Sequence, residues 1–216
     1  MMENRCSSSQ GSREQGFGCS YKLAREQLAK IGDIQEQCRK SGAQYVEPNE
    51  IVINYLNQPY YITLPDVEIS LEDSKVEVPL KDKILILHYF TEAKGTPPTG
   101  ILITYKRLPG GVSYFPAFSQ RAIAPFINQF GKNPELLIKA AAKLGAHEAD
   151  HGDVSVTVNA FDHVPITLVL WRGDEELASN GNILFDANIS DYLSTEDVTV
   201  LTETIIWKLV KDNPST

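Results

Sequence analysis

Short runs of β-branched and aromatic residues come in groups along this chain, with no helical segment between the members of one group. The first four form a meander over residues 51–56, 60–64, 67–71 and 76–78, a single run at residues 101–105 predicts a buried strand, and the last two form a hairpin over residues 154–158 and 166–171. Strands that come in runs pair as antiparallel neighbours, whereas strands that alternate with helices build a parallel sheet. The sequence therefore predicts an α+β fold with a mainly antiparallel sheet.

Apolar residues at helical spacing predict N-terminal, central and C-terminal helices around this sheet. The expected helices cover residues 20–42, 81–94, 116–130, 133–144 and 195–211. The last helix has the clearest start. Ser194 is a favourable N-cap, and Asp197, three residues later, completes an acidic variant of the capping box.

The size of the chain fits one domain. A chain of 216 residues that folds as one unit buries roughly 70% of the surface that it exposes when unfolded. We expect a single domain over residues 20–211. Residues 1–19 are rich in Ser, Gly, Gln and charge, which predicts a disordered N-terminal tail, and residues 212–216 are expected to form a C-terminal tail.

The charge balance argues against two classes of partner. There are 28 acidic and 20 basic residues, a net charge of -8, which repels phosphate backbones and acidic lipid surfaces. The longest apolar run, residues 164–171, is far shorter than the roughly 20 residues of a membrane span. We expect neither nucleic acid nor membrane as a partner. The 3 cysteines cannot all pair with one another, which favours a reducing, cytoplasmic location.

One short segment contains the spacing of a zinc hydrolase. His147, Glu148 and His151 match H-E-x-x-H, which on a helix places two imidazoles on one zinc ion and a glutamate beside the bound water. Gly145 and Gly152 flank the segment, so it would lie at a frayed helix end. The alternative is a polar helix terminus, where histidine complements the helix dipole.

His88 suggests a different kind of site. It lies in the apolar stretch Leu87-His88-Tyr89-Phe90, where a buried imidazole needs a hydrogen-bond partner. A neutral histidine in such a place can be the axial ligand of a haem or a corrinoid. The aromatic residues expected to form the wall of that cofactor site are Tyr89, Tyr114, Phe115 and Trp171. The alternative is a core histidine that is bonded to a backbone carbonyl.

Acidic residues gather in the last quarter of the chain. Asp174, Glu175 and Glu176 are followed by Asp186 and Asp191, and carboxylates in this number can bind a hard cation or perform acid–base chemistry. The alternative is a solvated turn followed by short capped elements. The sequence contains no glycine loop of the phosphate-binding kind and no serine-hydrolase elbow.

Several short motifs occur in a fixed order between about Tyr21 and Leu209. They are Leu87-His88-Tyr89, Gly100-Ile101-Leu102-Ile103, Leu108-Pro109-Gly110-Gly111, Val164-Pro165, Leu170-Trp171, Gly173-Asp174-Glu175-Glu176, Leu184-Phe185-Asp186, Tyr192-Leu193 and Glu196-Asp197. In this order they resemble an uncharacterised family known as domain of unknown function 3786. The resemblance implies proteins of anaerobic bacteria and archaea, some with an attached iron–sulfur segment and some in settings of corrinoid-dependent metabolism. It implies no established activity.

Three hypotheses for the function follow. The first is a non-catalytic protein of anaerobic metabolism that binds a small molecule or a cofactor, such as a corrinoid or another tetrapyrrole, through His88. The second is a zinc-dependent hydrolase that uses His147, Glu148 and His151. The third is a protein–protein adaptor for redox or methyl-transfer partners, with the acidic residues 174–176 at the contact. An iron–sulfur cluster would need four closely spaced cysteines, which this chain lacks.

Overall fold

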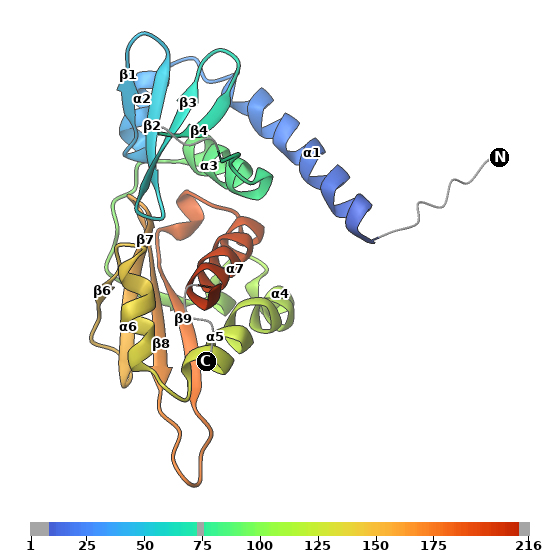
Figure 1. Ribbon diagram of the computed structural model, residues 1–216. Helices are drawn as coiled ribbons and strands as arrows, with labels where there is room; N and C mark the ends of the chain where they lie inside the picture. Colours follow the sequence, from blue (N-terminus) through green and yellow to red (C-terminus); the bar gives the residue numbers. More distant parts are fainter. Residues whose placement is uncertain (1–8, 73–75, 212–216) are drawn as a thin grey trace, which may run out of the picture.

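A computed structural model describes residues 9–72 and 76–211, which fold around two antiparallel sheets (Figure 1). The first part of the chain forms α1 (Ser9–Leu28), α2 (Ile34–Ser41), β1 (Gln44–Val46), β2 (Glu50–Tyr55), β3 (Gln58–Thr63), β4 (Glu68–Leu71) and α3 (Leu80–Glu92). The second part forms β5 (Leu102–Thr104), η1 (Tyr105–Arg107), α4 (Gly111–Phe118), η2 (Ser119–Ile123), α5 (Ala124–Phe130), α6 (Glu135–Ala142), β6 (His147–Glu148), β7 (Val154–Phe161), β8 (Val164–Trp171), β9 (Asn180–Asp186), η3 (Ile189–Asp191) and α7 (Thr195–Lys211). The predicted α+β class is confirmed.

The four-stranded sheet has the order β1-β2-β3-β4, and each strand pairs antiparallel with the next. Buried and more exposed side chains alternate along β2 and β3, because one face of the sheet joins the core and the other faces solvent. The β2–β3 hairpin turns at Leu56 and Asn57, whose φ angles are 50° and 63°. A two-residue turn with positive φ at both positions matches the twist of the flanking strands.

The five-stranded sheet has the order β5-β9-β8-β7-β6 and is also antiparallel throughout. One face packs against the helices of the second part; for example, the ring of Phe185 on β9 lies 6.1 Å from that of Phe118 on α4. The other face is more polar, and the hydroxyls of Thr157 and Thr167 bond across β7 and β8 at 2.9 Å. The helix layer on the apolar face positions the candidate site.

A stack of four aromatic rings joins the two sheets into one core. Phe161 on β7 lies between Tyr55 on β2 and Tyr89 on α3, with ring centroids 4.9 Å and 3.9 Å away. The ring of Tyr89 also stacks on Tyr192, 5.6 Å away. Because these rings come from both parts of the chain, the two sheets share a single apolar interior.

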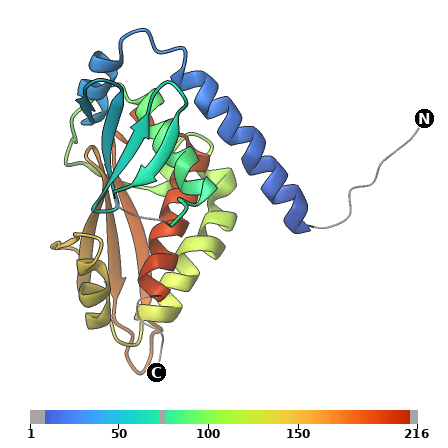
Figure 2. The same ribbon diagram turned by 45° about the horizontal axis from the view of Figure 1, so that its top comes forward.

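Helix α1 runs away from the body of the molecule, as Figure 1 and Figure 2 both show. Its second half is attached to the first sheet, where the Tyr21 hydroxyl donates to the carbonyl of Val67 at 3.1 Å. The disordered tail predicted for residues 1–19 is wrong over the part that α1 covers. Residues 1–8 and 212–216 lie outside the described part of the chain.

Several predicted boundaries change for local reasons. The helix predicted over residues 20–42 is two helices, because Asp33 ends the first connection by capping α2, with a 2.8 Å bond from the Glu36 amide. The helix predicted over 116–130 begins earlier, at Gly111, and contains the π-helical turn η2. Residues 76–78 form no strand, and β9 lies where only short capped elements were expected. The C-terminal helix, α7, has the predicted bounds.

None of the helices in the described part of the chain combines the length and the hydropathy that a membrane span requires.

Candidate functional site

The first turn of α7 is fixed by its capping residues. The Asp197 amide donates to the Ser194 hydroxyl at 3.1 Å, and that hydroxyl donates to the Asp197 carboxylate at 2.6 Å. Ser194 thus caps the helix as the sequence predicts, which confirms the start of α7, while the Asp197 carboxylate accepts from the Ser194 hydroxyl in place of the backbone amide that a capping box uses. The second carboxylate oxygen of Asp197 remains available for another partner.

That partner is His88, on α3. Its Nδ1 lies 2.8 Å from Oδ1 of Asp197, so the histidine is bonded to a carboxylate and not to the backbone carbonyl considered above. The hydrogen bond to Asp197 raises the pKa of His88, although burial acts in the opposite direction. A histidine held through Nδ1 presents a fixed Nε2 to its surroundings.

Nε2 of His88 has no hydrogen-bond partner within the described residues. The imidazole lines a small hollow of about 140 Å³ that we call the His88 hollow. Its wall is formed by α1, α3 and the start of α7, through Phe17, Ser20, Lys81, Ile84, Leu85, His88, Ser194, Glu196, Asp197 and Val200. Two of these residues, Phe17 and Ser20, come from the projecting helix α1.

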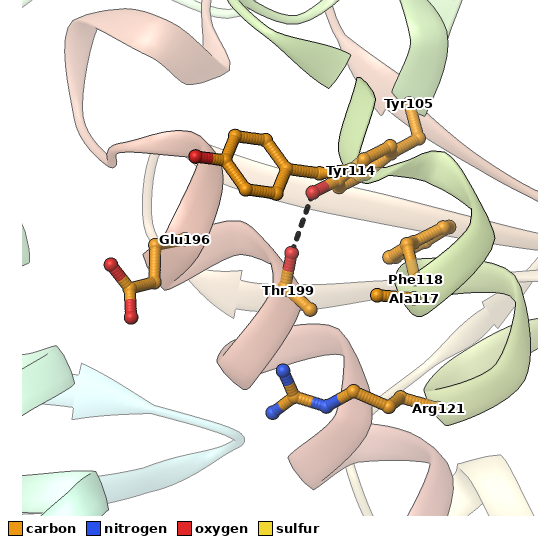
Figure 3. Close-up of a pocket in the computed structure, with 7 residues that line it drawn as sticks. All are labelled: Tyr105, Tyr114, Ala117, Phe118, Arg121, Glu196 and Thr199. Atoms are coloured by element: carbon orange, nitrogen blue, oxygen red, sulfur yellow. Dashed lines mark hydrogen bonds between the residues drawn. The ribbon is translucent and has the colours of Figure 1, made fainter. Parts of the chain in front are cut away.

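A larger pocket of about 400 Å³ lies on the other side of Glu196, between α4 and α7 (Figure 3). We call it the Tyr114 pocket. It is lined by Tyr105, Tyr114, Ala117, Phe118, Arg121, Glu196 and Thr199. Glu196 therefore belongs to the walls of both cavities.

The floor of the Tyr114 pocket is rigid. The Thr199 hydroxyl donates to the carbonyl of Thr195 at 2.9 Å, and the Tyr105 hydroxyl donates to Thr199 at 2.7 Å. The Tyr105 ring stacks on Phe118 with 3.9 Å between centroids. With these hydroxyls satisfied and these rings packed, the floor supplies shape to a ligand and few free hydrogen bonds.

The rim of the pocket carries the exposed aromatic and charged side chains. Tyr114 is 62% exposed and lies above Thr199, while Arg121 lies below it (Figure 3). Nε and Nη2 of Arg121 both donate to Oε2 of Glu203, with the Nε contact at 3.0 Å. Glu196 makes no hydrogen bond or ion pair with the residues that the structure describes. A positive and a negative group thus stand at the rim beside an aromatic wall.

The structure separates the five aromatic and histidine residues predicted for a cofactor site. His88 and Tyr114 line neighbouring cavities. Tyr89 is a fully buried core residue whose hydroxyl donates to the carbonyl of Ser41. Phe115 packs beneath Lys106, whose Nζ lies 4.2 Å from the ring centroid, and Trp171 lies at the end of β8.

The H-E-x-x-H segment does not form a helix. His147 and Glu148 pair with β7 as the short strand β6, and His151 follows in a bend. The predicted helix terminus is therefore wrong, and the spacing of four residues no longer aligns the two imidazoles on one face. Within residues 9–72 and 76–211, no group of three or more His, Cys, Asp or Glu side chains is placed to hold a metal ion.

Two of the acidic residues considered above anchor the connection from α3 to β5. Asp186 accepts bonds from the amides of Thr99 and Gly100 at 3.0 and 2.7 Å. Burial raises its pKa, but these two amides, the Thr99 hydroxyl and, above all, the amide of Asn188 hold the pKa below the usual range. Asp191 pairs with Lys94 at 2.9 Å. Because their oxygens are bonded to the chain itself, these carboxylates serve the fold.

The chain matches the family model described as "Domain of unknown function (DUF3786)" over residues 33–207. It belongs to this family. The match confirms the resemblance read from the sequence motifs and includes every residue of the Tyr114 pocket. Helix α1 precedes the matched region, so this DUF3786 protein closes the His88 hollow partly with residues outside it. No curated protein and no solved structure gives a significant match.

Sequence reasoning did not find most of the Tyr114 pocket. Arg121, Thr199 and Tyr105 carry no motif of their own, and they meet only because η1 and η2, the segments on either side of α4, come together with α7. One signal was present: Glu196 adjoins the capping pair and belongs to a family motif. Glu196 is a charged residue close to the Ser194 cap, and its own helix offers it no oppositely charged neighbour. This pattern indicated a candidate ligand-binding residue.

Proposed function

We propose that this DUF3786 protein binds a small molecule non-covalently in the Tyr114 pocket. One observation carries the proposal: a cavity of about 400 Å³ is lined by the aromatic rings of Tyr105, Tyr114 and Phe118 together with the charged side chains of Glu196 and Arg121. Ligand pockets typically hold roughly 300–1,000 Å³ and combine apolar walls with a few oriented polar groups. The Tyr114 pocket has both properties.

The proposal concerns a small organic molecule and not a tetrapyrrole. The His88 hollow holds about 140 Å³, which is below the range of roughly 300–1,000 Å³ for ligand pockets. A macrocycle on Nε2 of His88 would require α1 to move away, and Tyr89, the expected wall, is inside the core. Haem and corrinoid therefore do not fit the residues as they are placed.

An absorption spectrum tests this conclusion about His88. We expect no shift of the haemin or cobalamin bands when the protein is added. A shifted band that disappears in His88→Ala would contradict the conclusion and return the tetrapyrrole to first place.

No comparable cluster of side chains supports the zinc-hydrolase hypothesis or the adaptor hypothesis within the described residues. A catalytic zinc needs three protein ligands, and His147 and His151 have no third among the described residues. Residues 174–176 lie in the exposed β8–β9 connection, where Asp174 accepts bonds from the amides of Glu176 and Leu177. A role for this connection in an adaptor, and a setting in anaerobic metabolism, stay predictions.

A thermal-shift screen of a metabolite library tests the proposed function. We expect at least one compound to raise the melting temperature of the wild type, and we expect Tyr114→Ala to abolish the rise. The matched control is Val112→Ala, on the same helix and 70% exposed but outside the pocket lining. The proposal fails if no compound stabilises the protein, or if Tyr114→Ala responds as the control does.

A further inference from the structure

The Tyr114 pocket extends along one face of α7. Glu196, Thr199 and Glu203 are spaced at i, i+3 and i+7, which places them in a row on one side of a helix. A separation of seven residues at 1.5 Å each is about 10 Å along the helix axis. Glu196 therefore stands at one end of the row, and Arg121, held by Glu203, stands toward the other.

Each end of the row has spare capacity for a ligand. Glu196 is unpaired within the described residues, so its carboxylate can accept from an ammonium group. Arg121 uses Nε and Nη2 for Glu203. Because a guanidinium has five donors in a fork, the Nη1 donors remain for a carboxylate.

The middle of the row suits an apolar group. Ala117 and the ring of Phe118 line it, and the exposed ring of Tyr114 stands over it. The hydroxyls of Tyr105 and Thr199 are bonded to each other, so the middle offers little to a polar ligand atom. An aromatic or aliphatic side chain would lose no hydrogen bond there.

From this arrangement we infer that the ligand is an elongated zwitterion of dipeptide or tripeptide length, with its ammonium group at Glu196 and its carboxylate at Arg121. An extended chain spans about 3.3–3.6 Å per residue. Two residues therefore span about 7 Å and three about 10 Å, which approach or reach the length of about 10 Å between the ends of the row, whereas a single α-amino acid carries its charges too close together. The inference rests on the proposed function and names its ligand class.

Calorimetric titration with three matched peptides tests the inference: Ala-Phe, N-acetyl-Ala-Phe and Ala-Phe-amide. Acetylation removes the ammonium charge and amidation removes the carboxylate. Because both charged groups lie at a partly solvated rim, we expect each modification to weaken binding to the wild type by roughly three- to tenfold. These measurements use the unmodified protein and depend on no variant.

Two variants assign each charge to its residue. In Glu196→Gln, Ala-Phe and N-acetyl-Ala-Phe should bind with equal affinity, and in Arg121→Gln, Ala-Phe and Ala-Phe-amide should do so. The controls Glu175→Gln and Arg39→Gln change an exposed charge outside the pocket and should keep the wild-type differences. Circular dichroism checks that each variant is folded.

The outcomes separate the inference from the proposed function. If binding depends on Tyr114 but neither modification weakens it in the wild type, the inference is wrong and the proposed function stands. The inference is also wrong if the charge preferences persist in Glu196→Gln and Arg121→Gln. If none of the three peptides binds while another compound from the screen does, the pocket is a ligand site for a different class.

Discussion

On the α3 side of Glu196 the polar side chains are bonded to one another, whereas on the α4 side Glu196 forms no hydrogen bond within the described residues and Arg121 uses only part of its guanidinium, for Glu203. Ser194, Asp197 and His88 form a continuous chain of hydrogen bonds. Across the turn, Glu196 forms no hydrogen bond or ion pair within the described residues, although its charge helps to raise the pKa of His88, and Arg121 keeps part of its guanidinium unused. The His88 hollow and the Tyr114 pocket thus share a wall and differ in whether their polar groups are satisfied.

This difference separates groups that stabilise the fold from groups that remain for a ligand. Polar groups that are hydrogen-bonded within the chain offset the free energy of their desolvation, and they keep no donor or acceptor for a ligand. Groups at the rim stay hydrated in the free protein and can exchange water for a ligand. Substitutions in the first set should therefore change stability, and substitutions in the second should change binding alone.

The largest expected difference is between two residues of α4. Phe118 is 0% exposed and stacked on Tyr105, whereas Tyr114 is 62% exposed. Phe118→Ala should lower the free energy of unfolding by about 3–5 kcal/mol, and Tyr114→Ala should change it by less than about 0.5 kcal/mol. Chemical denaturation measures both. Equal losses of unfolding free energy in the two variants would show that Tyr114 packs in the core as Phe118 does, and would remove the contrast between the two residues.

A second contrast is between neighbours on α7. Asp197 is 7% exposed and bonds both Ser194 and His88, so Asp197→Asn should cost about 1.5–3 kcal/mol of unfolding free energy, the range for hydrogen bonds to charged groups. Glu196→Gln should be within about 0.5 kcal/mol of wild type. Urea titrations of the two variants measure both free energies of unfolding. A destabilised Glu196→Gln would indicate a structural partner for the Glu196 carboxylate.

Removal of the cap should have a smaller effect. Ser194→Ala deletes the acceptor of the Asp197 amide, and loss of an N-cap typically costs about 1 kcal/mol. Ser113→Ala, an exposed serine in the first turn of α4, is the control and should be nearly neutral. If Ser194→Ala is also neutral by denaturation, the capping pair does not fix the site.

The smallest effect is a pH dependence of stability that arises from His88. Its folded pKa lies above the unfolded value of about 6.5, so its contribution is fully present below about pH 6.5 and is lost as pH rises through the folded pKa. The stability difference between wild type and His88→Asn should therefore shrink as pH rises above about 6.5 and passes the raised folded pKa of His88. Parallel stability curves for the two proteins would show that the bond to Asp197 does not favour the charged imidazole.

The local parts of the fold were predictable because local chemistry specifies them. The Ser194 cap and Asp197 define the start of α7, and alternating valines define β7. Strand β9 was missed because Asn180, Gly181 and Asn182 hide its beginning, and it becomes a strand by pairing with β8 on one side and β5 on the other. Such a strand depends on partners distant in the sequence.

The candidate site shows the same division. His88 was a candidate because an imidazole in an apolar helix needs a hydrogen-bond partner. The sequence did not reveal that this partner would be Asp197, 109 residues away. Tyr114 stood out as an aromatic residue after a glycine turn. Its place opposite Glu196 and Arg121 depends on how α4 packs on α7.

The sequence by itself determined the α+β class, the cap of α7 and the family to which the chain belongs, because each of these is written in the order and spacing of neighbouring residues. Only the tertiary structure decided which polar groups would be satisfied and which would remain free. Hydrogen-bond partners are assigned by packing between distant segments, so the unused carboxylate of Glu196 and the partly used guanidinium of Arg121 became visible only when α4 and α7 lay side by side.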